Sequence, residues 1–135
     1  MDTNYDKEVL LTPTENPEGM VERTVSEICS TIHIADEQYG NILLALTEAV
    51  DNAIVHGNKS DLHKKVHISC HYEPHDLIFS VSDEGQGFDF EHISDPTVLE
   101  NPAEEGRGLF IMKHLADKVE FKNKGNTVLL SFHLN

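Results

Sequence analysis

Two hairpin patterns, one in the middle of the chain and one at its end, constrain the fold more than any other sequence feature. Residues 66–72 alternate apolar and polar side chains, a short turn follows, and residues 77–82 alternate again. The same arrangement recurs in residues 118–122 and 127–134, which are separated by Asn-Lys-Gly-Asn. Period-two alternation predicts strands with one buried face, and short turns predict antiparallel pairing. The chain is therefore expected to build a mostly antiparallel sheet.

Three further segments carry apolar residues at helical spacing and supply a layer that covers this sheet. They are residues 18–32, 36–56 and 109–116. Asp36 is expected to cap the second helix, and Gly57 is expected to end it. Residues 9–11 are expected to form a short edge strand behind a mobile start, residues 1–8. The resulting order, βααββαββ, predicts an α+β fold of two layers in which helices cover one face of the sheet.

The length and charge of the chain limit its architecture and its partners. The 135 residues suit a single domain with one core, and no apolar run approaches the roughly 20 residues of a membrane-spanning helix. The net charge of -14 disfavours direct contact with nucleic acid or an anionic membrane. We therefore expect a soluble, cytoplasmic protein that meets phosphate groups through backbone N–H groups, a metal ion and single basic residues.

Residues 46–58 carry the first candidate site residues. Glu48 and Asn52 are four positions apart, so their side chains lie one above the other on one helix face. A carboxylate and a carboxamide at this spacing can hold a divalent cation and activate a hydroxyl group. The same pattern also fits an ordinary amphipathic helix with a solvated Glu and Asn, and this segment alone does not separate the two interpretations.

Two glycine-rich segments supply further candidates. Residues 83–87, Asp-Glu-Gly-Gln-Gly, directly follow a strand, and their glycines let a ligand approach the backbone closely. Asp83 is placed to accept a hydrogen bond from an exocyclic amine such as that of adenine, although a turn with an acidic cap fits equally well. Gly106-Arg107-Gly108 lies where a loop enters the third helix, so its N–H groups and the helix dipole predict an anion site. Arg107 either adds a charge to a bound phosphate or points to solvent.

The order of these three segments, with an acidic stretch between the last two, resembles the GHKL family of ATP-binding domains. This family includes histidine-kinase catalytic domains, gyrase subunits and heat-shock chaperones. Within it, TEAVDNAIVHGN, DEGQGFD and GRGLFIMKHLADKVE are similar to the bacterial anti-sigma-factor serine kinases of the RsbW and SpoIIAB type. The resemblance extends from about residue 18 to residue 134. It implies the GHKL fold, a two-layer sandwich with a mixed, mostly antiparallel sheet.

The resemblance also implies a role for each matching residue. Glu48 matches the general base that takes the proton of a substrate serine, and Asn52 matches the Mg²⁺ ligand that bridges to the phosphates. Asp83 matches the aspartate that reads adenine. The remaining matches are the base-pocket glycines Gly85 and Gly87, the phosphate-facing Gly106, Arg107, Gly108 and Leu109, the adenine-contacting Thr127, and the ATP lid, residues 88–105.

The implied activity is that of an ATP- and Mg²⁺-dependent kinase that binds a sigma factor and phosphorylates a serine on an anti-anti-sigma (STAS) protein. Arg23 resembles an arginine that members use to grip both partners, and the family implies a homodimer joined at a sheet edge. One departure separates the chain from some kinase members. Glu104 and Glu105 stand where those members place a basic and a hydroxyl residue beside the γ-phosphate, and acidic side chains repel it. The alternative is therefore an ATP-binding regulatory module without kinase activity.

Overall fold

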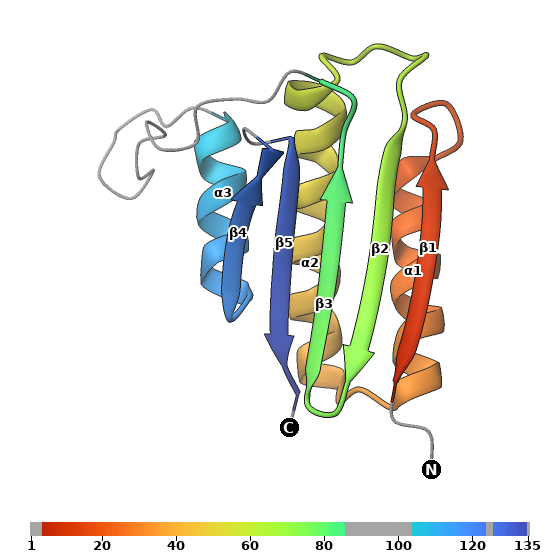
Figure 1. Ribbon diagram of the computed structural model, residues 1–135, viewed down its shortest axis with the longest axis vertical. Coiled ribbons are helices and arrows are strands. Elements are labelled where there is room, and N and C mark those ends of the chain that lie inside the picture. Colours follow the sequence, from red (N-terminus) through yellow and green to blue (C-terminus); the bar gives the residue numbers. More distant parts are fainter. Residues whose placement is uncertain (1–3, 86–103, 124–125, 135) are drawn as a thin grey trace.

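In residues 4–85, 104–123 and 126–134, which the computed structural model describes, an antiparallel sheet of five strands packs against a layer of three helices (Figure 1). The strands are β1 (Tyr5–Leu11), β2 (Val66–Glu73), β3 (Asp76–Ser82), β4 (Lys118–Lys122) and β5 (Thr127–His133). The helices are α1 (Pro17–Ile32), α2 (Asp36–Asn52) and α3 (Glu104–Leu115), and a π-helix, η1 (Ala53–Gly57), continues α2. The order of strands and α-helices is the predicted one.

The sheet has the strand order β1-β2-β3-β5-β4, and each neighbouring pair is antiparallel. The two predicted hairpins are present as β2–β3 and β4–β5. Because β5 pairs with β3, the two hairpins join into one sheet, and β1 and β4 form its edges. The predicted α+β fold of two layers with a mostly antiparallel sheet is therefore confirmed. The mixed strand directions that the resemblance implied are not found among the described strands, because every neighbouring pair is antiparallel.

One cluster of buried apolar side chains fills the space between the sheet and the helices. Phe79 and Phe132 lie on neighbouring strands with ring centroids 6.1 Å apart in an edge-to-face arrangement. The central helix, α2, has α1 on one side and α3 on the other (Figure 1). Among the described helices, none combines the length and hydrophobicity that a membrane-spanning segment needs. The core thus holds α2 between α1 and α3. This determines the positions of the residues on the last turns of α2.

The first strand is longer than the sequence predicted. It begins at Tyr5, within the segment that was expected to be mobile. Its polar side chains contact β2: His71 Nδ1 lies 2.6 Å from Asp6 Oδ1, and this hydrogen bond raises the pKa of His71. His67 Nε2 lies 2.9 Å from Glu8 Oε1. Such cross-strand partners order the segment, and a local sequence pattern cannot reveal them.

Both ends of the central helix also differ from expectation. Ala35 occupies the cap position and its side chain makes no cap hydrogen bond, so Asp36 lies in the first turn instead. A negative side chain is favourable there because of the helix dipole. At the other end the chain does not stop at a glycine cap but continues as η1. The N–H of Asn58 donates to the carbonyl oxygen of Ala53 over 2.8 Å, the i→i−5 bond of a π-helix.

The two cysteines offer a test of the packing between α1 and the sheet. Burial raises the pKa of Cys29 to about 11 and the pKa of Cys70 to about 12. Because the thiolate is the reactive form, both thiols should react with an aromatic disulfide at pH 8 at least about a hundredfold more slowly in the folded than in the denatured protein. The reaction is followed by absorbance with and without denaturant. Equal rates in the two states would contradict this packing.

Candidate functional site

A cleft of about 310 Å³ opens where α2 and η1 face the first turns of α3. Its lining residues come from both sides and are Glu48, Asp51, Asn52, Val55, His56, Arg107, Gly108 and Ile111. Four of the predicted site residues therefore lie together, although more than fifty positions separate the two segments in the sequence. These four are Glu48, Asn52, Arg107 and Gly108.

Gly108 lets α3 approach α2 closely at this cleft. A Cβ atom at this position would lie 3.1 Å from Glu48 Oε1 and 3.2 Å from Asn52 Oδ1. Any side chain would occupy the space beside these two oxygens, whereas glycine leaves it open. Carboxylate and amide oxygens are ligands that Mg²⁺ accepts. The amide oxygen of Asn52 therefore suits a ligand of a divalent cation, and the carboxylate of Glu48 lies beside it.

The predicted phosphate-facing residues lie inside α3 rather than ahead of it. The helix begins at Glu104, so Gly106 and Arg107 belong to its first turn, and residues 104 and 105 at the end of the expected lid, residues 88–105, are helical. The first four N–H groups of a helix have no acceptor within it. The predicted anion site therefore stays at this end of α3.

Asp83 lies at the end of β3, against the last residue of η1. Its Oδ1 accepts a hydrogen bond from the N–H of Gly85 over 2.7 Å, and its own N–H donates to the carbonyl oxygen of Asn126 over 2.9 Å. Burial raises the pKa of the Asp83 carboxyl, while the Gly85 N–H and the charge of Lys64 oppose this shift. A Cβ atom on Gly57 would lie 2.1 Å from Asp83 Oδ2, so only glycine at this position leaves room for the carboxylate.

Gly85 and Thr127 flank Asp83. A Cβ atom on Gly85 would lie 1.9 Å from the carbonyl oxygen of Gly57, so this close approach of two backbones requires glycine. Thr127 begins β5, as predicted, and pairs with Ser82, the last residue of β3. The hydroxyl oxygens of this pair are 3.0 Å apart. A carboxylate, a glycine and a hydroxyl group thus meet at one end of the sheet.

The chain matches the histidine kinase-like ATPase domain over residues 13–132. It is 31% identical over 124 residues to an anti-sigma F factor of Bacillus subtilis (strain 168), and the match covers 87% of this chain and 85% of that relative. This chain belongs to the histidine kinase-like ATPase family, in its anti-sigma-factor branch. Membership of an ATPase family implies that it uses ATP, and the predicted family is confirmed.

Two further similarities agree with this assignment. Serine-protein kinase RsbW of Bacillus subtilis (strain 168) is 29% identical over 125 residues, with coverage of 87% of this chain and 78% of the relative. The crystal structure of the RsbU and RsbW domains of Rv1364c from Mycobacterium tuberculosis superposes with a TM-score of 0.68 at 18% identity. That match covers 96% of this chain and 32% of the other chain, and at this identity it supports the fold alone.

Three of the predicted site residues do not line the cleft or the group around Asp83. Two of them lie in other parts of the fold, and the third lies outside the residues that the structure describes. Leu109 is 6% exposed and belongs to the core, so its side chain supports α3 from within. Arg23 is exposed on α1, which lies on the other side of α2 from α3 (Figure 1). Gly87 and residues 88–103 lie outside the described residues.

The group around Asp83 is separate from the lining of the α2–α3 cleft, and η1 connects the two. Asn52 immediately precedes η1, and Gly57 ends it against Asp83. A π-helix of this kind is rare and often occurs at functional sites. A ligand that spans η1 would therefore reach both groups.

Two asparagines that the sequence analysis did not single out hold the loops of the ATPase fold together here. Asn58 is 2% exposed; its Oδ1 accepts from the N–H of Glu84 over 2.7 Å, and its Nδ2 donates to the carbonyl oxygen of Lys65 over 3.0 Å. Asn126 Nδ2 donates to the carbonyl oxygen of Gly85 over 3.2 Å. The partners are far apart in sequence, so no local signal marks either residue.

Asn58→Ala is expected to lower the free energy of unfolding by about 1–3 kcal/mol, because it leaves buried backbone groups without their hydrogen bonds. Asn41→Ala is the matched control, since Asn41 is exposed on α2, and its effect should stay within about 0.5 kcal/mol. Urea unfolding followed by circular dichroism measures both. Equal stabilities of the two variants would show that Asn58 does not anchor this loop.

Proposed function

We propose that this chain is an ATP- and Mg²⁺-dependent protein serine kinase that also acts as an anti-sigma factor in the cytoplasm. It holds a sigma factor inactive, and it phosphorylates a serine on an anti-anti-sigma protein of the STAS type. The observation that carries this proposal is the space that Gly108 leaves beside Glu48 and Asn52. Relatives named anti-sigma F factor and serine-protein kinase RsbW support the two halves of the proposal.

The α2–α3 cleft suits the triphosphate end of the nucleotide. Asn52 would provide an amide oxygen for Mg²⁺, whose charge would offset that of the phosphates. Arg107 and the first-turn N–H groups of α3 meet the phosphates, and Gly106 and Gly108 keep Cβ atoms away from them. A chain with a net charge of -14 has few basic side chains for this purpose. When bound, Mg-ATP supplies the phosphoryl group with much of its charge already neutralised.

The group around Asp83 suits the adenine end. The Asp83 carboxylate accepts a hydrogen bond from the exocyclic amine, and the Gly85 N–H holds that carboxylate in place. Gly85 and Gly87 line the base pocket without side chains that would fill it. Thr127 adds a hydroxyl group at the start of β5. Asp83 is half-buried, so a base that offers no donor to its free oxygen would be bound less well.

Glu48 acts as the general base. It accepts the proton of the acceptor serine hydroxyl while the serine oxygen forms a bond to the γ-phosphorus. The bond between that phosphorus and the bridging oxygen breaks, and ADP leaves. The phosphoserine then carries a charge of roughly -1.5 to -2, which disfavours contact with an acidic surface. The phosphorylated antagonist is released, and the sigma factor returns to the kinase.

An exposed arginine and two sheet edges are the surfaces proposed for the partners. Arg23, exposed on α1, contacts the sigma factor and the antagonist in turn. The edge strands β1 and β4 are the two places where a second copy of the chain can extend the sheet into a homodimer.

A second candidate function is favoured by Glu104 and Glu105, which lie in the first turn of α3. Two acidic residues beside a triphosphate weaken the stabilisation that phosphoryl transfer needs. In that case ATP would only order the partner-binding surface, and the chain would be a regulatory binding module.

One assay separates the two functions. The protein is mixed with γ-labelled ATP, Mg²⁺ and its cognate STAS protein. Transfer of label to a serine of that protein supports the kinase, provided that no label is transferred when EDTA is present from the start. Saturable ATP binding without transfer supports the binding module, and a protein that binds no ATP contradicts both.

A further inference from the structure

Two exposed apolar side chains, neither assigned a role in binding the nucleotide, lie on α2 and η1 on either side of Glu48. Leu44 lies one turn before Glu48 and is 46% exposed, and Val55 lies two turns after it and is 43% exposed. Asp51 lies between Glu48 and Val55. Positions 44, 48 and 51 are spaced by four and three residues on α2, so they share one helix face. Val55, on η1, lines the same cleft as Glu48 and Asp51. We call these four residues the α2 crest.

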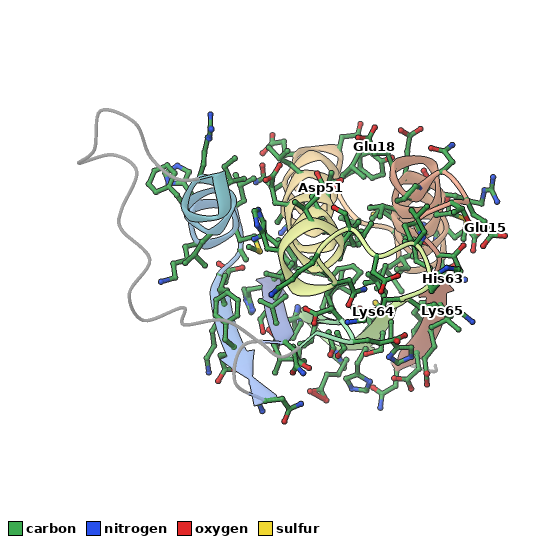
Figure 2. All side chains as sticks on the ribbon, turned by 90° about the horizontal axis from the view of Figure 1, so that it is seen from above. Glu15, Glu18, Asp51, His63, Lys64 and Lys65 are labelled. Atoms are coloured by element: carbon green, nitrogen blue, oxygen red, sulfur yellow. The ribbon has the colours of Figure 1, made fainter. Side chains whose placement is uncertain are left out.

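The crest is the face of α2 that the core does not use. The buried residues of this helix form the opposite stripe and are Ile42, Ala45, Leu46, Ala49 and Val50. Figure 2 views the molecule along the helix axes and labels Asp51 on α2, the helix between the other two. Glu48, Asp51 and Val55 also line the α2–α3 cleft. The crest is therefore both the outer surface of the helix and the rim of the proposed active site.

The position of Glu48 on this crest determines how an acceptor can reach it. A general base must come within about 2.6–3.2 Å of the oxygen whose proton it takes. One helical turn spans about 5.4 Å, so a polypeptide that delivers its serine hydroxyl to Glu48 also covers the neighbouring turns. Leu44 and Asp51 occupy those turns. The residues on either side of the serine must therefore meet an apolar side chain and a carboxylate.

We propose that the α2 crest is the docking surface for the serine-bearing segment of the phosphoacceptor. The segment carries two apolar side chains, one that packs on Leu44 and one that packs on Val55 about three turns further along. Between them it carries a basic side chain that interacts with Asp51. The inference rests on the proposed kinase function and adds the chemistry of its substrate. Charge complementarity selects this occupant: the crest carries two acidic residues, Glu48 and Asp51, against one arginine, Arg107, in the cleft lining beside them. The whole chain has a net charge of -14, so a second copy of it would meet like charges.

The test compares steady-state kinetics of phosphate transfer to the STAS antagonist in the wild type and in Leu44→Ala. The KM for the antagonist should rise by about tenfold, equivalent to about 1.4 kcal/mol, with kcat and the affinity for ATP retained. The matched control is Leu62→Ala, because Leu62 is also an exposed leucine, 62% exposed, but lies in the loop between η1 and β2. This variant should behave as the wild type does, and Leu44→Met should restore the KM.

A second variant tests the charged part of the surface. Asp51→Asn should raise the KM for the antagonist at low salt and reduce its dependence on ionic strength, because a charge pair at the interface is screened by salt. An unchanged salt dependence in this variant would overturn the assignment of a basic acceptor side chain to Asp51.

The surface can be judged even if the wild type transfers no phosphate. Binding of the antagonist to the ATP-loaded protein is then titrated calorimetrically with the same variants. Weaker binding of the antagonist to Leu44→Ala but not to Leu62→Ala supports the crest as the docking surface. The absence of phosphate transfer would then contradict only the proposed kinase activity. Equal antagonist binding, or equal KM values, in these two variants would overturn the inference.

Discussion

Glu48→Ala is expected to slow phosphoryl transfer to the antagonist by about 10²–10⁴-fold, the usual contribution of a general base. ATP affinity should stay close to the wild-type value, because the proposed contacts to phosphates and base come from other residues. Glu48→Gln should be nearly as slow, since the amide keeps the shape of the side chain but cannot accept the proton. Transfer is measured from γ-labelled ATP at saturating nucleotide, and ATP binding is measured separately.

The control for this pair is Glu37→Ala, which removes an exposed acidic residue from the first turn of the same helix. This substitution removes one negative charge, as Glu48→Ala does, but Glu37 lies far from the cleft. If Glu37→Ala slows transfer as much as Glu48→Ala does, general electrostatics rather than base catalysis explains the effect. If neither Glu48 variant slows transfer, Glu48 is not the base.

Gly85→Ala is expected to abolish ATP binding and to lower the free energy of unfolding by about 1–3 kcal/mol, the usual cost of overpacking. The added methyl group would lie 1.9 Å from the carbonyl oxygen of Gly57, and a backbone atom cannot rotate away as the end of a side chain can. Relief requires η1 and the end of β3 to separate. That movement displaces Asp83, whose carboxylate the Gly85 N–H holds.

Gly40→Ala provides the matched control, because a Cβ atom on Gly40 meets nothing within 4 Å. Gly40 lies inside α2, so alanine there should raise stability by about 0.5–1 kcal/mol and leave ATP binding unchanged. Urea unfolding and nucleotide titration are carried out on both variants. A Gly85→Ala protein that binds ATP as well as Gly40→Ala does would contradict the proposed arrangement of η1 against β3.

The local parts of the fold were predictable from the sequence, and the long-range parts were not. Alternation in residues 66–72 and 77–82 predicts a hairpin because strand, turn and strand are contiguous. The pairing of Ser82 with Thr127 joins the two hairpins, yet it depends on how α3 returns the chain to the sheet. The start of β1 was missed for a similar reason, because Asp6 is ordered by a partner 65 positions away.

The features of the candidate site also fall into local ones, which the sequence predicts, and long-range ones, which it does not. Helical spacing alone places Glu48 and Asn52 on one face, since both lie on α2. Gly108 joins them only through the packing of α3 against α2, which the family resemblance implied and no periodicity could show. Gly57 was expected merely to end a helix, whereas the structure uses its missing side chain to admit the carboxylate of Asp83.

The central claim is that three separate segments meet on one molecule of ATP. Isothermal titration of Mg-ATP into the wild type and into one variant of each segment tests it most directly. The variants are Asn52→Ala, Asp83→Asn and Gly108→Val. The account predicts saturable binding of one nucleotide to the wild type and an affinity at least about tenfold lower, or about 1.4 kcal/mol, in each variant. Wild-type affinity in any of the three, or no heat from the wild type, would contradict it.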